Sequence, residues 1–149
     1  MANQTTILTV SFNSWDYLLL NYQLSLKTNS QDLKWIIINN RPDDESEKKK
    51  SYYELKKQKN IKIIDGLNRD VLYKKLRVSR ARPQAFHHAY ALNIGIQYCD
   101  TNFLVVLDPD FYIIKNNWAK DIRDFVEENG IIFFGATWTK PYTEKLTTK

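Results

Sequence analysis

The chain alternates short apolar runs with longer amphipathic stretches, and this alternation constrains its fold more than any other feature. The apolar runs are rich in β-branched residues and end in polar, turn-forming residues, which is typical of buried strands. Strands are expected at residues 5–10, 35–38, 61–64, 103–107 and 131–135. Helices are expected to begin near Trp15 and Pro42 and to span residues 84–98 and 118–128. Such a chain folds as an α/β protein, in three α/β/α layers around a mainly parallel, twisted sheet.

Apolar residues at helical spacing predict which face of each helix packs on the sheet. For the first helix these residues are Trp15, Leu18, Leu19, Tyr22 and Leu26. For residues 84–98 they are Ala85, His88, Ala89, Leu92 and Ile96. Gly95 is expected to allow close packing between that helix and a strand.

Length and composition indicate a single domain over residues 1–149. Apolar residues make up 43% of the chain and charged residues 26%, which is enough to form a core. The single cysteine, Cys99, excludes an internal disulfide and a cysteine-based zinc site. No apolar run approaches the roughly 20 residues of a membrane span, and no secretory signal is visible. We therefore expect a cytoplasmic protein.

The positive charge of the chain is regional. The net charge is +5, and residues 41–80 hold 13 basic and 7 acidic residues, a local charge of +6. A basic region favours an anionic partner such as a phosphate, a nucleotide or a nucleic acid. The alternative is a solvated helix face, because most of these lysines are interleaved with glutamates.

Short polar residues follow each expected strand, at the edge where parallel sheets bind ligands. They are Ser11-Phe12-Asn13, Asn39-Asn40, Asp65-Gly66 and Asp108-Pro109-Asp110. Two carboxylates two residues apart can hold one hard divalent cation and leave positions open for phosphate oxygens. Asp-Pro is also a common turn opener, so the Asp-x-Asp pattern is weak on its own.

The order of these segments resembles the nucleotide-sugar-binding half of inverting glycosyltransferases with the Rossmann-like GT-A fold, in the family-2-like group. Four local matches carry the resemblance: residues 10–13 (VSFN), 36–40 (IIINN), 88–95 (HAYALNIG) and 107–110 (LDPD). Each match is loose, whereas the ordered set is moderately specific. The resemblance covers nearly the whole chain, from Thr5 to Trp138.

The resemblance implies a nucleotide site with a metal ion. Phe12 would lie against the base, with contacts from Ser11 and Asn13, and Asp65 would border the pocket. Asn39 or Asn40 would bond the base edge where the family usually has Asp, which leaves the identity of the base open. Arg82, His87 and His88 would approach the diphosphate, although adjacent histidines cannot both face the sheet. Asp108 would touch the ribose or the metal, and Asp110 would bind Mn²⁺ or Mg²⁺.

The resemblance also implies what is missing. The family's general base follows the fifth strand, where Glu144 is the sole carboxylate of residues 141–149, and the acceptor-binding half is largely absent. We expect a donor-binding half for sugar transfer to an unknown acceptor. Its partner is a nucleoside-diphosphate sugar, and self-association stays open. The alternatives are a non-catalytic module of the same fold and, ranked lower, a nucleic-acid-binding accessory domain.

Overall fold

A computed structural model describes residues 4–29, 33–41, 49–67, 71 and 83–130. Their elements follow one another as β1 (Thr5–Ser11), α1 (Trp15–Thr28), β2 (Lys34–Asn39), α2 (Lys50–Lys56), β3 (Ile61–Asp65), α4 (Pro83–Ile96), β4 (Phe103–Val106) and α5 (Trp118–Glu128). The predicted alternation of strands and helices is confirmed. The expected start of the second helix near Pro42 and the expected strand at 131–135 lie outside the described residues.

The four strands form one parallel sheet in the order β3-β2-β1-β4. The chain runs outward from β1 through β2 to β3 and then returns across the sheet, so that β4 pairs with the other side of β1. The strand order therefore reverses between β1 and β4. In open α/β sheets, ligands bind beside such a switch point, beyond the carboxyl ends of the strands.

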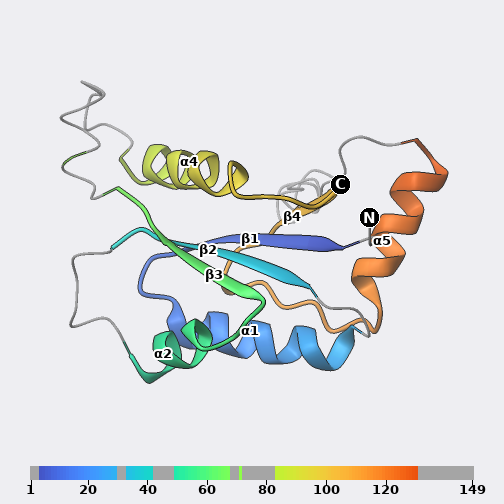
Figure 1. Cartoon of the computed structure of the whole chain (residues 1–149), viewed down its shortest axis with the longest axis horizontal. Coiled ribbons are helices and arrows are strands. Elements are labelled where there is room, and N and C mark those ends of the chain that lie inside the picture. Colours follow the sequence, from blue (N-terminus) through green and yellow to red (C-terminus); the bar gives the residue numbers. More distant parts are fainter. Residues whose placement is uncertain (1–3, 30–32, 42–48, 68–70, 72–82, 131–149) are drawn as a thin grey trace, which may run out of the picture.

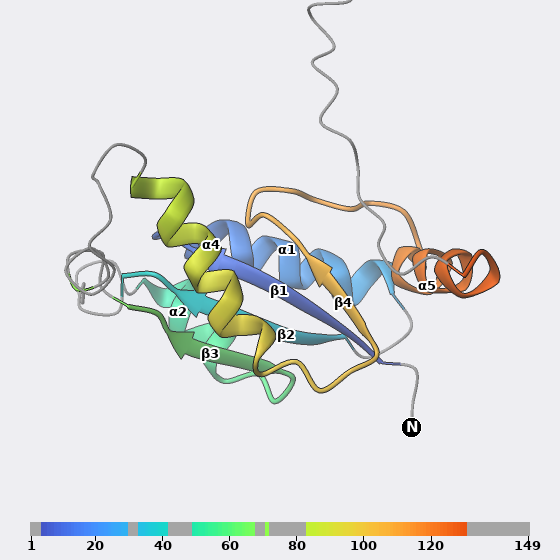
Figure 2. The same cartoon turned by 90° about the horizontal axis from the view of Figure 1, so that it is seen from above.

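Helices cover both faces of the sheet, as predicted. Figures 1 and 2 show α4 on one face and α1 with α2 on the other, while α5 lies beside the sheet next to the C-terminal end of α1. Side chains that alternate along β1 supply two cores: Ile7 packs with Trp15 and Trp35 on the α1 face, and Leu8 packs with Ala91 on the α4 face. This alternation is what a strand buried on both faces requires.

The prediction of the packed face of α4 is confirmed at Leu92 and in the close approach of Gly95 to a strand, and it is wrong at Ala89 and Ile96. His87, Ala91 and Gly95 are buried, whereas Ala89 is exposed and Ile96 is 48% exposed. A Cβ added at Gly95 would lie 3.2 Å from Leu8 Cγ and closer still to its methyl groups. The helix thus turns its smallest residues toward β1. Because α4 is apolar around much of its circumference, counting apolar residues could not identify this face.

The prediction for α1 holds except at its C-terminal end. Trp15, Leu18 and Tyr22 are buried, but Leu26 is 55% exposed and Ser25 takes its place on the packed face. The hydroxyl of Ser25 donates to the carbonyl of Tyr22 at 2.7 Å, so it can be buried without losing a hydrogen bond.

None of the described helices is long and apolar enough to cross a lipid bilayer.

Candidate functional site

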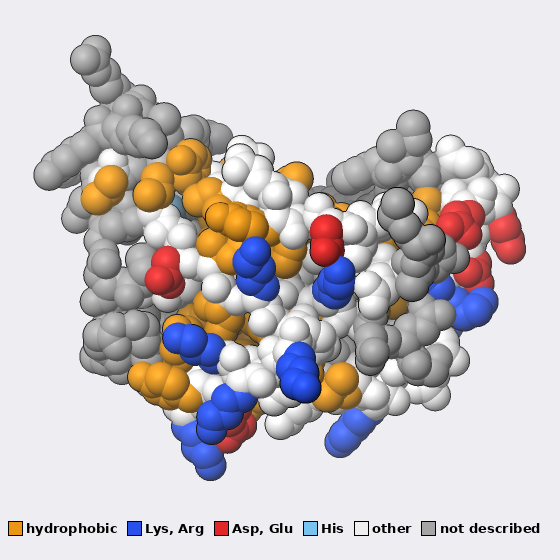
Figure 3. Space-filling view, in the orientation of Figure 1, with side chains coloured by type: hydrophobic (Ala, Val, Ile, Leu, Met, Phe, Trp, Pro, Cys, Tyr) orange, Lys and Arg blue, Asp and Glu red, His pale blue; other side chains and the backbone are white. Residues whose placement is uncertain are grey.

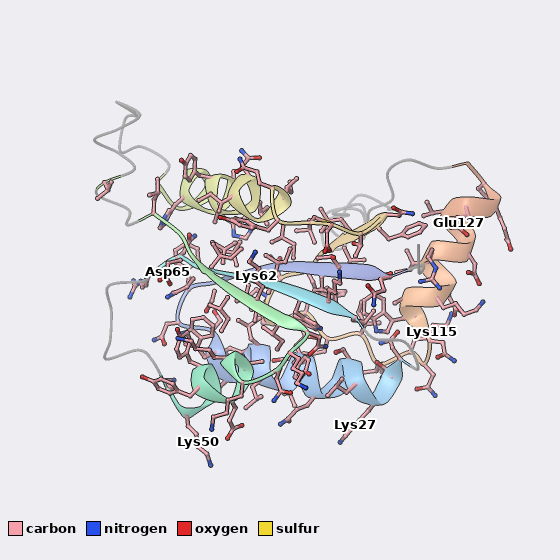
Figure 4. The ribbon with its side chains drawn as sticks, in the orientation of Figure 1. Lys27, Lys50, Lys62, Asp65, Lys115 and Glu127 are labelled. Atoms are coloured by element: carbon pink, nitrogen blue, oxygen red, sulfur yellow. The ribbon has the colours of Figure 1, made fainter. Side chains whose placement is uncertain are left out.

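The carboxyl ends of β1, β2 and β3 bring three of the predicted site residues into one row. Strand register aligns Ser11 with Asn39, and Asn39 with Asp65. The amide of Asn39 is fully engaged there, because Nδ2 donates to Asp65 Oδ1 at 3.1 Å and Oδ1 accepts from the backbone N–H of Arg41 at 3.1 Å. Asn39 therefore orients Asp65 and cannot flip without losing both bonds. Figure 4 shows Asp65 at this end of the sheet.

Asn40 differs from its neighbour, although both are asparagines. Its backbone N–H continues the sheet by donating to the Ser11 carbonyl at 3.0 Å. Its side chain is 2% exposed, and neither Oδ1 nor Nδ2 has a hydrogen-bond partner. A buried amide with both groups unpaired is costly and rare in native proteins, so this side chain calls for a partner such as a ligand or a water molecule.

Gly66 makes room for Asn40. A Cβ added at Gly66 would lie 2.7 Å from Asn40 Oδ1 and 3.1 Å from the Asn39 carbonyl oxygen. Sequence reasoning placed Gly66 after a strand without giving it a role in the site. The motif Asp-Gly is a turn signal, and nothing in it shows that another side chain lies against the glycine.

His87 closes the α4 side of this region. It is 2% exposed, whereas His88 is partly exposed, so one histidine of the pair faces the sheet, as expected. His87 Nε2 donates to the Leu67 carbonyl at 2.8 Å, because a carbonyl only accepts, and Nδ1 has no partner. Leu67 was missed by sequence reasoning, since a backbone carbonyl leaves no signal in the residue type.

Phe12 stands between β1 and α4. Its ring lies edge-on to the His87 ring with 5.4 Å between centroids, and the side chain is 37% exposed. Asn13 follows it with φ of 56°, a left-handed conformation that asparagine tolerates better than most residues, and its Oδ1 is buried without a partner. We call Phe12, Asn13, Asn40, Gly66 and His87 the carboxyl-end cluster.

Asp108 and Asp110 follow β4 on the other side of β1. The last pair of the β1–β4 ladder is Leu8 with Val106, and the Leu107 N–H then donates to the Leu8 carbonyl at 3.0 Å. The Phe111 N–H donates to the Asp108 carbonyl at 3.1 Å, which closes a turn around Pro109. Both carboxylates are exposed, and within the described ranges neither takes part in an ion pair.

The chain after this turn crosses to α1. Asn21 Nδ2 donates to the Phe111 carbonyl at 2.9 Å. Burial is the main cause that raises the pKa of Tyr112, followed by repulsion from Tyr17 and from the Asp110 carboxylate.

Two other residues singled out from the sequence bear on the site. Arg82 and Glu144 lie outside the described residues. Among the described residues, no group of three or more His, Cys, Asp or Glu side chains gathers in a way that could hold a metal ion. A metal at Asp108 and Asp110 would thus take its other ligands from outside the described side chains.

A cleft lies at the amino ends of the strands, at the opposite end of the sheet from the carboxyl-end cluster. This amino-end cleft has a volume of about 810 Å³, and its lining includes four lysines, Lys34, Lys57, Lys59 and Lys62. Lys34 pairs with Asp100 at 2.9 Å, and the Lys62 ammonium lies 4.2 Å from the centroid of the Tyr98 ring. Figure 3 shows lysines spread over this face, among few acidic side chains. The cleft contains none of the predicted site residues.

The strand order and flanking helices define a parallel α/β domain with a switch point between β1 and β4, and the comparisons place this domain in a family. The sequence model for glycosyl transferase family 2 matches residues 6–149. The chain belongs to this family, and the predicted GT-A fold is confirmed. A search of curated proteins finds no match.

Solved structures with the same fold include S. aureus TarS. TarS 1–349 in complex with UDP-GlcNAc is 16% identical, with a TM-score of 0.55 over 85% of this chain and 32% of that one. TarS 1–349 alone is 14% identical, with a TM-score of 0.55 over 90% and 38% of the two chains. The longer TarS structure is 14% identical, with a TM-score of 0.57 over 91% and 23%. The chain thus spans between about a quarter and two fifths of the length of these relatives.

Proposed function

We propose that this domain binds a nucleoside-diphosphate sugar at the carboxyl ends of its sheet, for transfer of the sugar to an acceptor. The observation that carries the proposal is the gathering of unpaired buried polar atoms from three elements beside the switch point: Asn13 Oδ1 after β1, both amide atoms of Asn40 after β2, and His87 Nδ1 in α4. Native proteins leave few such atoms unpaired, so a cluster of them favours a polar ligand. The family and the UDP-GlcNAc complex of a structure with the same fold support the class of ligand.

Each residue of the carboxyl-end cluster has a role suited to its chemistry. Phe12 offers an exposed aromatic face for a base to stack on. Asn40 supplies one donor and one acceptor for the edge of the base. Nδ1 of His87 accepts a hydrogen bond while the ring is neutral, and protonation turns it into a donor for a phosphate oxygen. Asp65, held by Asn39, borders the pocket on the β3 side.

Asp108 and Asp110 are exposed carboxylates without an ion pair among the described residues, and such groups can bind a divalent cation. They would supply hard oxygen ligands and leave most of the coordination sphere to phosphate oxygens and water, which suits Mg²⁺ or Mn²⁺. When bound, such an ion neutralises the charge that develops on the departing nucleoside diphosphate. In this role Asp110 binds the metal, and Asp108 binds the metal or the ribose.

The transfer itself would proceed with inversion at the sugar carbon, as the resemblance to inverting enzymes implies. It requires a general base that removes the proton of the acceptor hydroxyl. No described residue has that role, so the base would come from residues beyond those described or from a partner. A non-catalytic nucleotide-binding module of the same fold is the second candidate, because none of the described residues is assigned the role of general base.

Thermal unfolding with UDP, with and without Mn²⁺, tests donor binding. At a free ligand concentration of 100 times Kd, binding stabilises the folded state by about 2.7 kcal/mol, or roughly 5–10 °C in Tm for a domain of this size. We expect such a shift with UDP and Mn²⁺, and we expect Asp110→Asn to lose the Mn²⁺-dependent part. Asp124→Asn on the exposed α5 is the matched control, because it removes the same charge at the other end of the molecule.

The results of these measurements distinguish between the proposed functions. A shift of equal size in Asp110→Asn would contradict the metal role, and no shift with any nucleoside diphosphate would contradict donor binding. Release of free nucleoside diphosphate from a nucleotide sugar, measured on the same protein, distinguishes an enzyme from a binding module. Salt-sensitive binding of oligonucleotides without competition from UDP would instead favour the nucleic-acid alternative.

A further inference from the structure

The adjacent asparagines at the carboxyl end of β2, Asn39 and Asn40, differ in the hydrogen bonding of their amides, and this difference bears on how the site would recognise a base. The Asn39 amide is fixed by two hydrogen bonds, one given to Asp65 and one received from the Arg41 backbone. The Asn40 amide has none. A rotation of 180° about the last side-chain bond exchanges the oxygen and nitrogen of an amide, and it costs little when neither atom is paired.

An amide that no hydrogen bond holds in one orientation matches two kinds of base edge. Uracil presents a ring N–H beside a carbonyl oxygen, so the amide oxygen accepts and the amide N–H donates. Cytosine presents a bare ring nitrogen beside an amino group, so the flipped amide donates to the ring and accepts from the amino group. A carboxylate only accepts, and it therefore suits the uracil ring N–H but repels the lone pair of the cytosine ring nitrogen.

We propose that Asn40 makes the nucleotide site tolerant of both pyrimidines, so that the domain binds CDP and UDP with similar affinity. This inference rests on the proposed function, because it concerns the base of the same nucleotide. It assigns base recognition to Asn40 rather than Asn39, a choice that the sequence leaves open. It also explains what the family's usual aspartate would add at this position, namely discrimination between the two bases.

The surroundings of Asn40 support this role. Asn40 packs under Gly66 and next to Ser11, whose neighbour Phe12 exposes its ring. Among the described residues no group forms a hydrogen bond with the amide, so no described hydrogen bond selects one of its two orientations. Reaching it requires neighbouring side chains to shift, as is common when ligands bind.

Calorimetric titration of the wild-type chain with UDP and CDP, at one Mg²⁺ concentration, is the test. We expect dissociation constants within about threefold of each other. In Asn40→Asp we expect CDP to weaken at least tenfold relative to UDP, because hydrogen bonds to a charged group are strong and the lone-pair contact becomes repulsive. Asn102→Asp, an exposed position at the opposite end of the sheet, adds the same charge and will leave the ratio unchanged.

Asn40→Ala keeps the inference falsifiable if a buried carboxylate prevents folding. It removes donor and acceptor together, so UDP and CDP will weaken by similar factors and their ratio will stay near the wild-type value. The inference is wrong if wild-type protein already prefers UDP over CDP tenfold or more, or if Asn40→Asp leaves the ratio unchanged. Absence of binding to either nucleotide would overturn the proposed function itself, which is a different result from binding with strong discrimination.

Discussion

Because Gly95 has no side chain, α4 packs close to the sheet at this residue. Alanine is the better helix former by about 1 kcal/mol, so propensity alone predicts that Gly95→Ala stabilises the protein. The added methyl group would instead overlap the side chain of Leu8, which is fully buried in the core. Overpacking of a core typically costs 1–3 kcal/mol, so we expect Gly95→Ala to lower the free energy of unfolding by about 1–2 kcal/mol.

Urea unfolding of Gly95→Ala measures this change. Asn93→Ala is the matched control on the same helix, because Asn93 is exposed and its replacement will be neutral or slightly stabilising. Greater stability of Gly95→Ala than of the wild type would show that α4 does not pack as closely on Leu8 as described.

The asparagines at residues 39 and 40 show where sequence reasoning stops at the residue scale. The pattern IIINN places both at the carboxyl end of a buried strand, and that much could be predicted. Which amide is paired depends on Asp65 and on Gly66, which lie 25 or more positions further along the chain. Strand register decides such contacts, and it is visible only in the folded structure.

At the scale of elements, Asn29 joins the end of α1 to the start of α5. Its Oδ1 accepts from the Ala119 N–H at 3.2 Å, and its Nδ2 donates to the Ser25 carbonyl at 3.1 Å. Asn117, the N-cap residue of α5, is left-handed and makes no side-chain cap bond, so Asn29 supplies the cap from another element. Loss of a helix cap typically costs about 1 kcal/mol.

We therefore expect Asn29→Ala to lower the free energy of unfolding by about 1 kcal/mol, measured by chemical denaturation. Asn29→Asp keeps the acceptor for α5, where a negative charge is favourable, but it loses the donor to the Ser25 carbonyl and places that charge at the C-terminal end of α1. We therefore expect it to retain only part of the stability. Asn93→Ala is the control, because Asn93 is exposed on another helix, α4. Equal loss in all three variants would contradict the capping role.

The positions of helices and strands were predicted better than the faces by which the helices pack on the sheet. Strand and helix alternation is a strong signal, and α5 begins and ends at the predicted residues. The prediction of the packed face of α4 failed at Ala89 and Ile96, because that helix is apolar on several sides. Close approach to the sheet, rather than apolar area, selects Ala91 and Gly95. The cap of α5 by Asn29 also could not be foreseen, since it joins residues 90 positions apart.

At the scale of the whole molecule, the two ends of the parallel strands differ in chemistry. The carboxyl-end cluster brings unpaired amide and imidazole atoms beside the switch point, with Asp108 and Asp110 following the next strand. The amino-end cleft is basic, and its lysines follow from the regional charge of the sequence. Charge alone would draw an anion to the amino-end cleft, whereas a nucleotide at the carboxyl ends needs stacking, polar partners for its base edge and a cation beside Asp108 and Asp110.

The central claim is that a nucleoside diphosphate binds at the carboxyl-end cluster. Titration of the ¹⁵N-labelled chain with UDP in the presence of Mg²⁺, followed by amide chemical shifts, locates the site directly. We predict that the largest shifts fall on Phe12, Asn40, Gly66 and His87 and on the turn at Asp108–Asp110. Shifts concentrated instead on Lys34, Lys57, Lys62 and Tyr98 of the amino-end cleft, or no shifts at all, would contradict the account.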